Sequence, residues 1–253
     1  MGKRHEAIGI KQAIRFEWMQ KAANLLLAGL DAKTIRQELH EFLADRKGNG
    51  SAGERGDTSR TQAVNILMNA WVVPQKELIS FRDACLENLE SDPDPFNDLA
   101  IHWSVINASY PFWNSVAKVV GRLLSLQNQV SQQQVFNRLR ERHGDRETVS
   151  RCARHVIRSL SYWGILSDCE AKGCYQIGNK IPIHSDYTIS LLFESILLSK
   201  KDGISSLADI QSSPGLFPFS FRSLNGSLII QRSQRVTLER YGLDEEILRL
   251  KAQ

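Results

Sequence analysis

The chain has 253 residues, of which 42% are hydrophobic and 24% are charged, so it can bury a sizeable core. This length fits one large domain or two to three small ones, and seven prolines and 16 glycines are too few for a fibrous or low-complexity protein. No apolar run approaches the roughly 18 residues that span a bilayer, and the amino terminus has no signal-peptide core. We therefore expect a cytoplasmic protein without a membrane partner.

The net charge of +4 is unevenly distributed along the chain. Residues 61–110 carry a net charge of −5, whereas residues 111–180 carry 11 basic and five acidic side chains, a net charge of +6. Arginine supplies most of this positive charge. A local basic face is typical of a protein that binds a polyanion, although such faces are also often simply solvated.

Helical periodicity dominates the start of the chain. Apolar positions three and four residues apart predict helices over 10–30 and 32–43, which make a helical pair of residues 1–44. Residues 45–57 contain four glycines, charges of both signs and nothing to bury. This composition predicts a flexible loop.

Residues 58–110 form a second helical segment in the same pattern. We expect one helix from Thr58 or Ser59, a second from Pro74 and a third over 96–109. Asp92-Pro-Asp-Pro95 breaks the chain between the second and the third. His102 lies on that last helix beside a tryptophan. It is expected to be a packed or half-exposed side chain rather than a metal ligand.

Residues 111–180 give the clearest pattern of the chain. The spacing predicts helices over 111–125, over 131–143 with Ser131 as N-cap, and from Glu147 to about residue 163. An extended link over 126–130 precedes the second helix. The tight turn Gly144-Asp-Arg146, with Asp145 as the next cap, precedes the third, and two short strands joined by a polar turn follow it. This order of elements predicts a winged helix-turn-helix.

The third of these helices is amphipathic. At about 100° per residue, five apolar side chains fall on one side: Val149, Ala153, Val156, Leu160 and Trp163. Three arginines share a narrow arc on the opposite side, flanked by His155 and Tyr162: Arg151, Arg154 and Arg158. A helix fits the major groove of DNA, where arginine binds phosphate or guanine in bidentate fashion.

We therefore predict that this segment binds double-stranded DNA through eight residues: Arg138, Arg142, Arg146, Arg151, Arg154, His155, Arg158 and Lys172. The helix carries the groove-facing arginines, and Arg138, Arg142, Arg146 and Lys172 are the expected phosphate contacts. Asp145 and Glu147 lie near the helix start, where bases would be read, and their negative charge disfavours contact with DNA at that point. If this helix does not contact DNA, the next candidates are Arg4, Lys11 and Arg15.

Residues 181–253 predict a small α/β part. We expect a helix from Ser185 or Asp186 to residue 198, and short strands over 219–221, 228–231 and 236–238, with Asn225-Gly226 as a hairpin turn. A short helix over 241–250, with Asp244-Glu-Glu246 at its exposed start, is expected to close the chain.

A search for catalytic and metal-binding motifs finds none. The sequence has no phosphate-binding glycine loop, no nucleophile elbow and no pair of histidines at helical spacing. The four cysteines match neither a disulfide framework nor a zinc-finger spacing. We therefore predict a protein without enzymatic activity, cofactor or metal.

A series of short motifs follows in order along residues 10–180. They are Ser59-Arg60, Trp71-Val-Val-Pro74, Phe81-Arg-Asp83, His102-Trp103, Tyr110-Pro-Phe112, Gly121-Arg-Leu-Leu124, and the Gly144 turn with its basic helix to Trp163-Gly-Ile-Leu166. In this order the chain resembles the BrxA family of BREX phage-defence systems. The resemblance implies a helical, non-catalytic DNA-binding component that acts beside other phage-defence proteins.

The sequence thus predicts a mainly α-helical protein with a central winged helix-turn-helix and a small α/β C-terminal part. Two other functions fit the same fold. One is a protein–protein adaptor whose winged helix docks another subunit, and the other is a transcriptional repressor.

Overall fold

In the computed structural model, residues 3–44, 56–241 and 245–251 are described. Most of the loop expected over 45–57 lies outside the described residues. The described part is mainly helical, with small β-sheets that are concentrated in the C-terminal part, as predicted. None of its helices is long and apolar enough to cross a membrane.

The first half of the described chain consists of helices. They are α1 (Phe16–Leu27), α2 (Ala32–Ala44), α3 (Asp57–Leu67), which continues as the π-helical turn η2 (Met68–Val72), α4 (Ile79–Ser91) and α5 (Pro95–Ser109), with short 3-10 helices η1 (Lys3–His5) and η3 (Lys76–Leu78). The helix predicted over 10–30 begins only at Phe16. Residues 7–15 are not helical, and both backbone groups of Ile14 bond to side chains, of Ser159 in α8 and of Trp163 at its C-cap.

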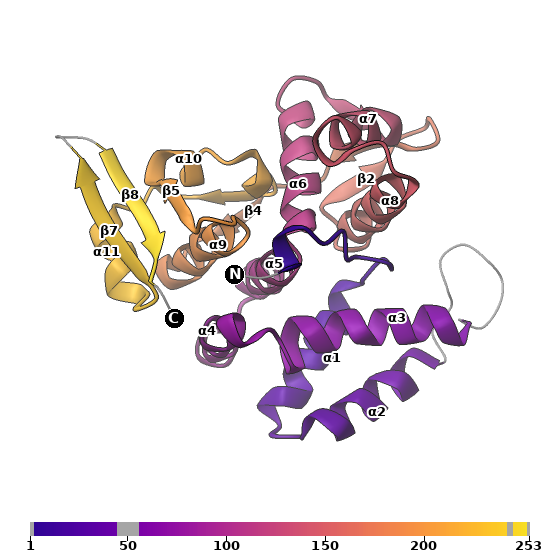
Figure 1. Ribbon diagram of the computed structural model, residues 1–253, viewed down its shortest axis with the longest axis horizontal. Coiled ribbons are helices and arrows are strands. Elements are labelled where there is room, and N and C mark those ends of the chain that lie inside the picture. Colours follow the sequence, from indigo (N-terminus) through magenta and orange to yellow (C-terminus); the bar gives the residue numbers. More distant parts are fainter. Residues whose placement is uncertain (1–2, 45–55, 242–244, 252–253) are drawn as a thin grey trace.

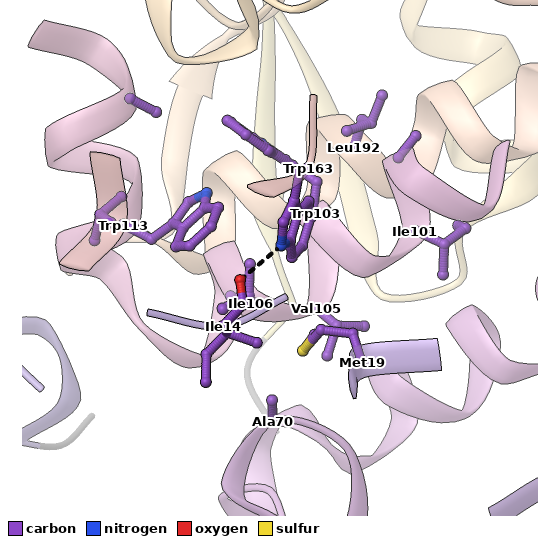
Figure 2. Close-up of a cluster of buried hydrophobic side chains, with 14 of the residues drawn as sticks. Ile14, Met19, Ala70, Ile101, Trp103, Val105, Ile106, Trp113, Trp163 and Leu192 are labelled. Atoms are coloured by element: carbon purple, nitrogen blue, oxygen red, sulfur yellow. Dashed lines mark hydrogen bonds between the residues drawn. The ribbon is translucent and has the colours of Figure 1, made fainter. Parts of the chain in front are cut away.

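Helix α5 lies at the centre of the molecule, between α1–α4, α6 and α9 (Figure 1). Every residue from Ala100 to Ala108 is buried, and a helix that is buried all round belongs in a core. Its Trp103 stacks edge-to-face on Trp113 of α6 at 5.4 Å between ring centroids, and Trp113 lies 5.4 Å from Trp163 (Figure 2). His102 is fully buried on the same helix, as predicted.

Residues 111–180 fold as the sequence predicts, in the order helix, strand, helix, turn, helix, hairpin. The elements are α6 (Pro111–Leu124), β1 (Gln129–Ser131), α7 (Gln132–His143), α8 (Glu147–Tyr162), β2 (Leu166–Asp168) and β3 (Cys174–Ile177). The strands form an antiparallel sheet in the order β1-β3-β2. Val130 faces Tyr175 and Ser167 faces Gln176 across it, so the link before α7 is a sheet strand.

Local signals set both ends of α7. Ser131 caps its N-terminus in a capping box with Gln134, and Gly144 ends it at a φ of 85°, which favours glycine. The prediction that Asp145 caps α8 is wrong, because the N-cap is Arg146, which makes no side-chain cap hydrogen bond. The Asp145 carboxylate instead lies 3.1 Å from Arg140 Nε.

The C-terminal part mixes short strands with helices. It contains β4 (Ile181–Ile183), α9 (Asp186–Leu198), β5 (Ile204–Ser206), α10 (Leu207–Gln211), the 3-10 helix η4 (Pro214–Leu216), β6 (Phe219–Phe221), α11 (Gly226–Arg232), β7 (Val236–Tyr241) and β8 (Glu245–Leu250). Strands β4 and β6 pair in parallel, and β5-β8-β7 form an antiparallel sheet beside α9 (Figure 1).

Three predictions for this part are wrong. Asn225-Gly226 is no hairpin turn, because the Asn225 side chain accepts a hydrogen bond from Leu228 N at 2.9 Å and starts α11, which replaces the strand expected over 228–231. The helix expected over 241–250 is not formed by the described residues: Tyr241 ends β7 and Glu245–Leu250 form β8, so Glu245 and Glu246 lie in a sheet, while Asp244 lies outside the described residues. Pairing with β7 and β5 satisfies the β8 backbone on both edges and buries Leu248, which overrides local helix preference.

Candidate nucleic-acid interface

Helix α8 turns one side to the core and the other to solvent. Val149, Ala153, Val156 and Leu160 are all 0% exposed, whereas Arg151, Arg154 and Arg158 are exposed. We call these three arginines the α8 arginine arc. The sequence predicts this division, because it follows from helical periodicity alone.

The α8 arginine arc has no acidic partner in the part of the chain that the structure describes. Within the described residues, no carboxylate lies within 4 Å of any of its guanidinium groups. The arc is held from one side by an aromatic contact, since the Arg154 guanidinium lies 5.6 Å from the centre of the Phe136 ring of α7. Three like charges are therefore presented to solvent without compensation.

Arginines elsewhere in the described chain are mostly paired. The ion pairs join Arg4 to Glu77, Arg82 to Asp83, Arg222 to Asp186, Arg235 to Glu194, Arg240 to Glu246, and Arg249 to Glu239. Surface ion pairs contribute little to stability, but they do neutralise local charge. Within residues 111–180, Arg138 pairs with Glu141 and Arg140 with Asp145, whereas the α8 arginine arc has no such partner in the described chain.

His155 lies between the arginines and is half-buried. Burial, followed by the positive charges of Arg158, Arg154 and Arg151, lowers its pKa to about 4. The imidazole is therefore neutral at physiological pH. It can donate or accept a hydrogen bond at this surface but adds no charge to it.

The N-terminal segment runs along α8 and extends this surface. Ile14 N donates to Ser159 Oγ at 2.9 Å, and Trp163 Nε1 donates to the Ile14 carbonyl at 3.0 Å (Figure 2). The Arg15 guanidinium then lies 4.3 Å from the centre of the Tyr162 ring at the end of α8. Sequence reasoning held Arg15 only in reserve, because no local pattern signals a contact between residues this far apart.

Arg4 does not belong to any such surface. Its side chain is buried, pairs with Glu77 at 2.9 Å, and donates to the carbonyls of Ala108 and Leu198. These contacts tie the amino terminus to α5 and α9. Arg4 is therefore a structural residue and is no longer a candidate for binding DNA.

The other predicted phosphate contacts do not share the α8 face. Arg138 and Arg142 line an open groove between α6 and α7, to which α8 contributes no residue, and Arg138 also pairs with Glu141 at 3.2 Å. Arg146 donates to the His143 carbonyl at 3.1 Å in the turn before α8. Lys172 is exposed in the turn between β2 and β3. Of the eight predicted residues, Arg151, Arg154, His155 and Arg158 thus lie on α8, whereas Arg138 and Arg142 line the groove between α6 and α7. Arg146 lies in the turn before α8, and Lys172 lies in the turn between β2 and β3.

The described histidine, cysteine and acidic side chains form no candidate metal site. Within residues 3–44, 56–241 and 245–251, no group of three or more histidine, cysteine or acidic residues could hold a metal ion. Cys85 and Cys152 are buried thiols, and burial raises the pKa of both. Thiols of this kind are unreactive.

The chain matches no protein-family model, and no curated protein or solved structure is significantly similar to it.

Proposed function

We propose that this protein binds duplex DNA through a winged helix-turn-helix formed by residues 111–180, with α8 as the helix that enters the major groove. The observation that carries the proposal is the exposed α8 arginine arc, which has no carboxylate partner in the described chain. In this reading α6 and β1 support the motif, α7 and α8 are its two helices, and β2 and β3 are the wing.

The geometry of α8 suits groove binding. Its inward side is fully buried, so the helix is held as a rigid rod while the opposite side remains free. Arg151 and Arg158 are two turns apart, which spreads the arc along roughly 10 Å of the helix at 1.5 Å per residue. Planar guanidinium groups at this spacing can bind phosphates on the groove wall or guanine edges on its floor.

Acidic residues near the start of α8 define which part of the helix contacts DNA. Glu147 occupies the first turn, where a carboxylate stabilises the helix dipole but repels phosphate. Asp145 is drawn to Arg140 at 3.1 Å and so is partly neutralised. We place the base-reading positions from Arg151 onward, and Lys172 on the wing contacts the neighbouring backbone.

The resemblance to the BrxA family extends the proposal to a biological setting. On that basis the protein is a non-catalytic, cytoplasmic component of a BREX-type phage-defence system and acts with other proteins of that system. Genes for a methyltransferase and a large ATPase beside its own would support this setting, whereas an operator that controls its own gene would support a transcriptional repressor.

The direct test is an anisotropy titration of a labelled duplex at several salt concentrations. If four to six phosphates are neutralised, log affinity falls with log salt at a slope of roughly −4 to −5. An excess of unlabelled duplex should then displace the labelled duplex and return the anisotropy to its starting value. Absence of binding at low salt would overturn the proposal and favour the protein–protein adaptor.

A further inference from the structure

A second cationic surface lies between α6 and α7. An open groove of about 580 Å³ there continues into a smaller depression beside η4 and then into a pocket of about 120 Å³ next to the end of α9. Arg142 lines all three, and Lys118 and Arg122 each line two of them. We call this continuous depression the α6–α7 channel.

Four cations of the channel lie on α6 and α7, two on each helix. Lys118 and Arg122 are one turn apart on α6, and Arg138 and Arg142 are one turn apart on α7. Lys118 shares a depression with Arg142. Arg122 shares the open groove with both Arg138 and Arg142. Lys200, just beyond the end of α9, adds a further cation at the pocket end of the channel.

Few acidic groups compensate these charges. Among the described residues, only Arg138 of the five cations lies within 4 Å of a carboxylate, that of Glu141. Glu6 also lines the pocket, but its carboxylate lies 3.6 Å from Lys201 Nζ. Asp209 lines the depression beside η4. Five cations and three carboxylates, those of Glu6, Glu141 and Asp209, thus line the channel, which leaves an excess of positive charge.

The Lys118 side chain is half-buried, and it shares the depressions of the channel with Lys200 and Arg142. Burial lowers its pKa, the charges of Lys200 and Arg142 lower it further, and Asp209 acts weakly in the opposite direction. A bound anion would relieve this repulsion and stabilise the ammonium form.

The pocket end also offers an unused polar atom. His143, which ends α7 and lines the pocket, has Nε2 buried and without a hydrogen-bond partner in the described chain. Buried polar atoms are rarely left unpaired, so such an atom in a cationic pocket calls for a ligand or a water. At about 120 Å³ the pocket is well above the roughly 15 Å³ that one water needs.

We propose that the α6–α7 channel binds phosphate groups, with Lys118 and Arg142 as the central pair, Arg122 and Lys200 on either side, and His143 as a neutral donor at the pocket end. This site is separate from the α8 arginine arc and does not depend on it. The phosphates come either from a free phosphate compound or from a nucleic-acid backbone that reaches this side of α7.

The test compares two variants that remove the same charge. K118Q/R142Q alters the channel, and R151Q/R158Q alters α8. Thermal melts with pyrophosphate, at ionic strength held constant with chloride, report a free phosphate ligand. We expect pyrophosphate to raise the Tm of the parent and of R151Q/R158Q, and to leave that of K118Q/R142Q unchanged. Melts without pyrophosphate, together with circular dichroism, establish that each variant folds.

Duplex titrations supply the second arm. If pyrophosphate has no effect but K118Q/R142Q weakens duplex binding and makes the salt slope shallower by about 2, the phosphates belong to a nucleic-acid backbone. Either result supports the channel. Two results together overturn the proposal. The first is that pyrophosphate changes the Tm of none of the three proteins, or changes all three equally. The second is that the duplex affinity of K118Q/R142Q equals that of the parent. Failure of the α8 proposal would appear separately, as an R151Q/R158Q variant that binds the duplex with the same affinity as the parent.

Discussion

The indole N–H of Trp163 donates a hydrogen bond of 3.0 Å to the backbone carbonyl of Ile14, across 149 positions of sequence. This bond fastens the N-terminal segment to the end of α8, and the Ile14 amide makes a second bond to Ser159 of the same helix. The position of α8 therefore depends on the first residues of the chain as well as on its own motif. Arg15 follows Ile14, and its guanidinium lies over the Tyr162 ring at the end of α8 and 4.0 Å from the Glu17 carboxylate.

We expect the W163F variant to be less stable than W113F. Both substitutions remove the same volume from neighbouring buried rings, but only Trp163 Nε1 has a partner, while Trp113 Nε1 is unpartnered in the described chain. W163F leaves the buried Ile14 carbonyl without its donor, which costs about 1–3 kcal/mol beyond the loss of volume. Urea unfolding of both variants measures the difference, and equal values would contradict the role of this bond.

The R151A/R154A/R158A variant should fold normally and lose DNA affinity by orders of magnitude. Exposed substitutions usually change the free energy of unfolding by within about 0.5 kcal/mol each. The salt slope should become shallower by about 3, one for each cation removed. A matched control is R222A/R240A/R249A, which removes the same charge from exposed arginines of the C-terminal part. Equal loss of affinity in both variants would mean that α8 makes no specific contact.

Truncation of the buried side of α8 should have the opposite profile. Leu160 is 0% exposed, so L160A opens a cavity and lowers the free energy of unfolding by about 2–5 kcal/mol. Leu126 is 79% exposed, and L126A should change it by less than about 0.5 kcal/mol. Chemical denaturation of the pair checks the prediction. A mild L160A phenotype would show that α8 is not anchored as described.

Stability should fall as the pH drops below 6.5. Burial lowers the pKa of His102 to about 3 in the folded protein, against 6.5 for the exposed side chain. Between these values the unfolded chain binds a proton that the folded chain does not, so acid favours unfolding. The loss between pH 7 and pH 5 is about 2 kcal/mol for this one group. His155, with a pKa of about 4, acts in the same direction.

Urea unfolding at pH 7 and pH 5 measures this loss, and H102Q serves as the control. The variant will have its own stability, so the quantity compared is the change between the two pH values. A smaller change in H102Q than in the parent supports the buried neutral imidazole. The same change in both would show that other groups carry the pH dependence.

Gly121 should not tolerate alanine, although it lies within α6. Alanine normally stabilises a helix relative to glycine by about 1 kcal/mol. A Cβ at this position, however, would lie 2.0 Å from the Pro214 carbonyl oxygen and 2.8 Å from Phe217 Cβ. We therefore expect G121A to lower the Tm, because η4 must move away from α6. An increase in Tm would contradict this close approach.

Much of the central segment follows from the sequence because its signals are local. Apolar periodicity located α6, α7 and α8, Ser131 and Gly144 marked the two ends of α7, and the same periodicity separated the arginines of α8 from its buried side. These features depend on residues within a few positions of one another. They can therefore form in a single helix before any tertiary contact is made.

Tertiary structure decided what no local pattern contains. Strand β8 has a sequence that fits a short helix, and only pairing with β5 and β7 makes it a strand. Arg138 and Arg142 are the same residue type as the α8 arginines and belong to the same basic segment. They nevertheless line the groove beside α6, whereas Arg154 lies over the Phe136 ring of α7. Which side of α7 a charge occupies depends on how three helices pack. Sequence periodicity gives the face of one helix but not the neighbour that this face meets.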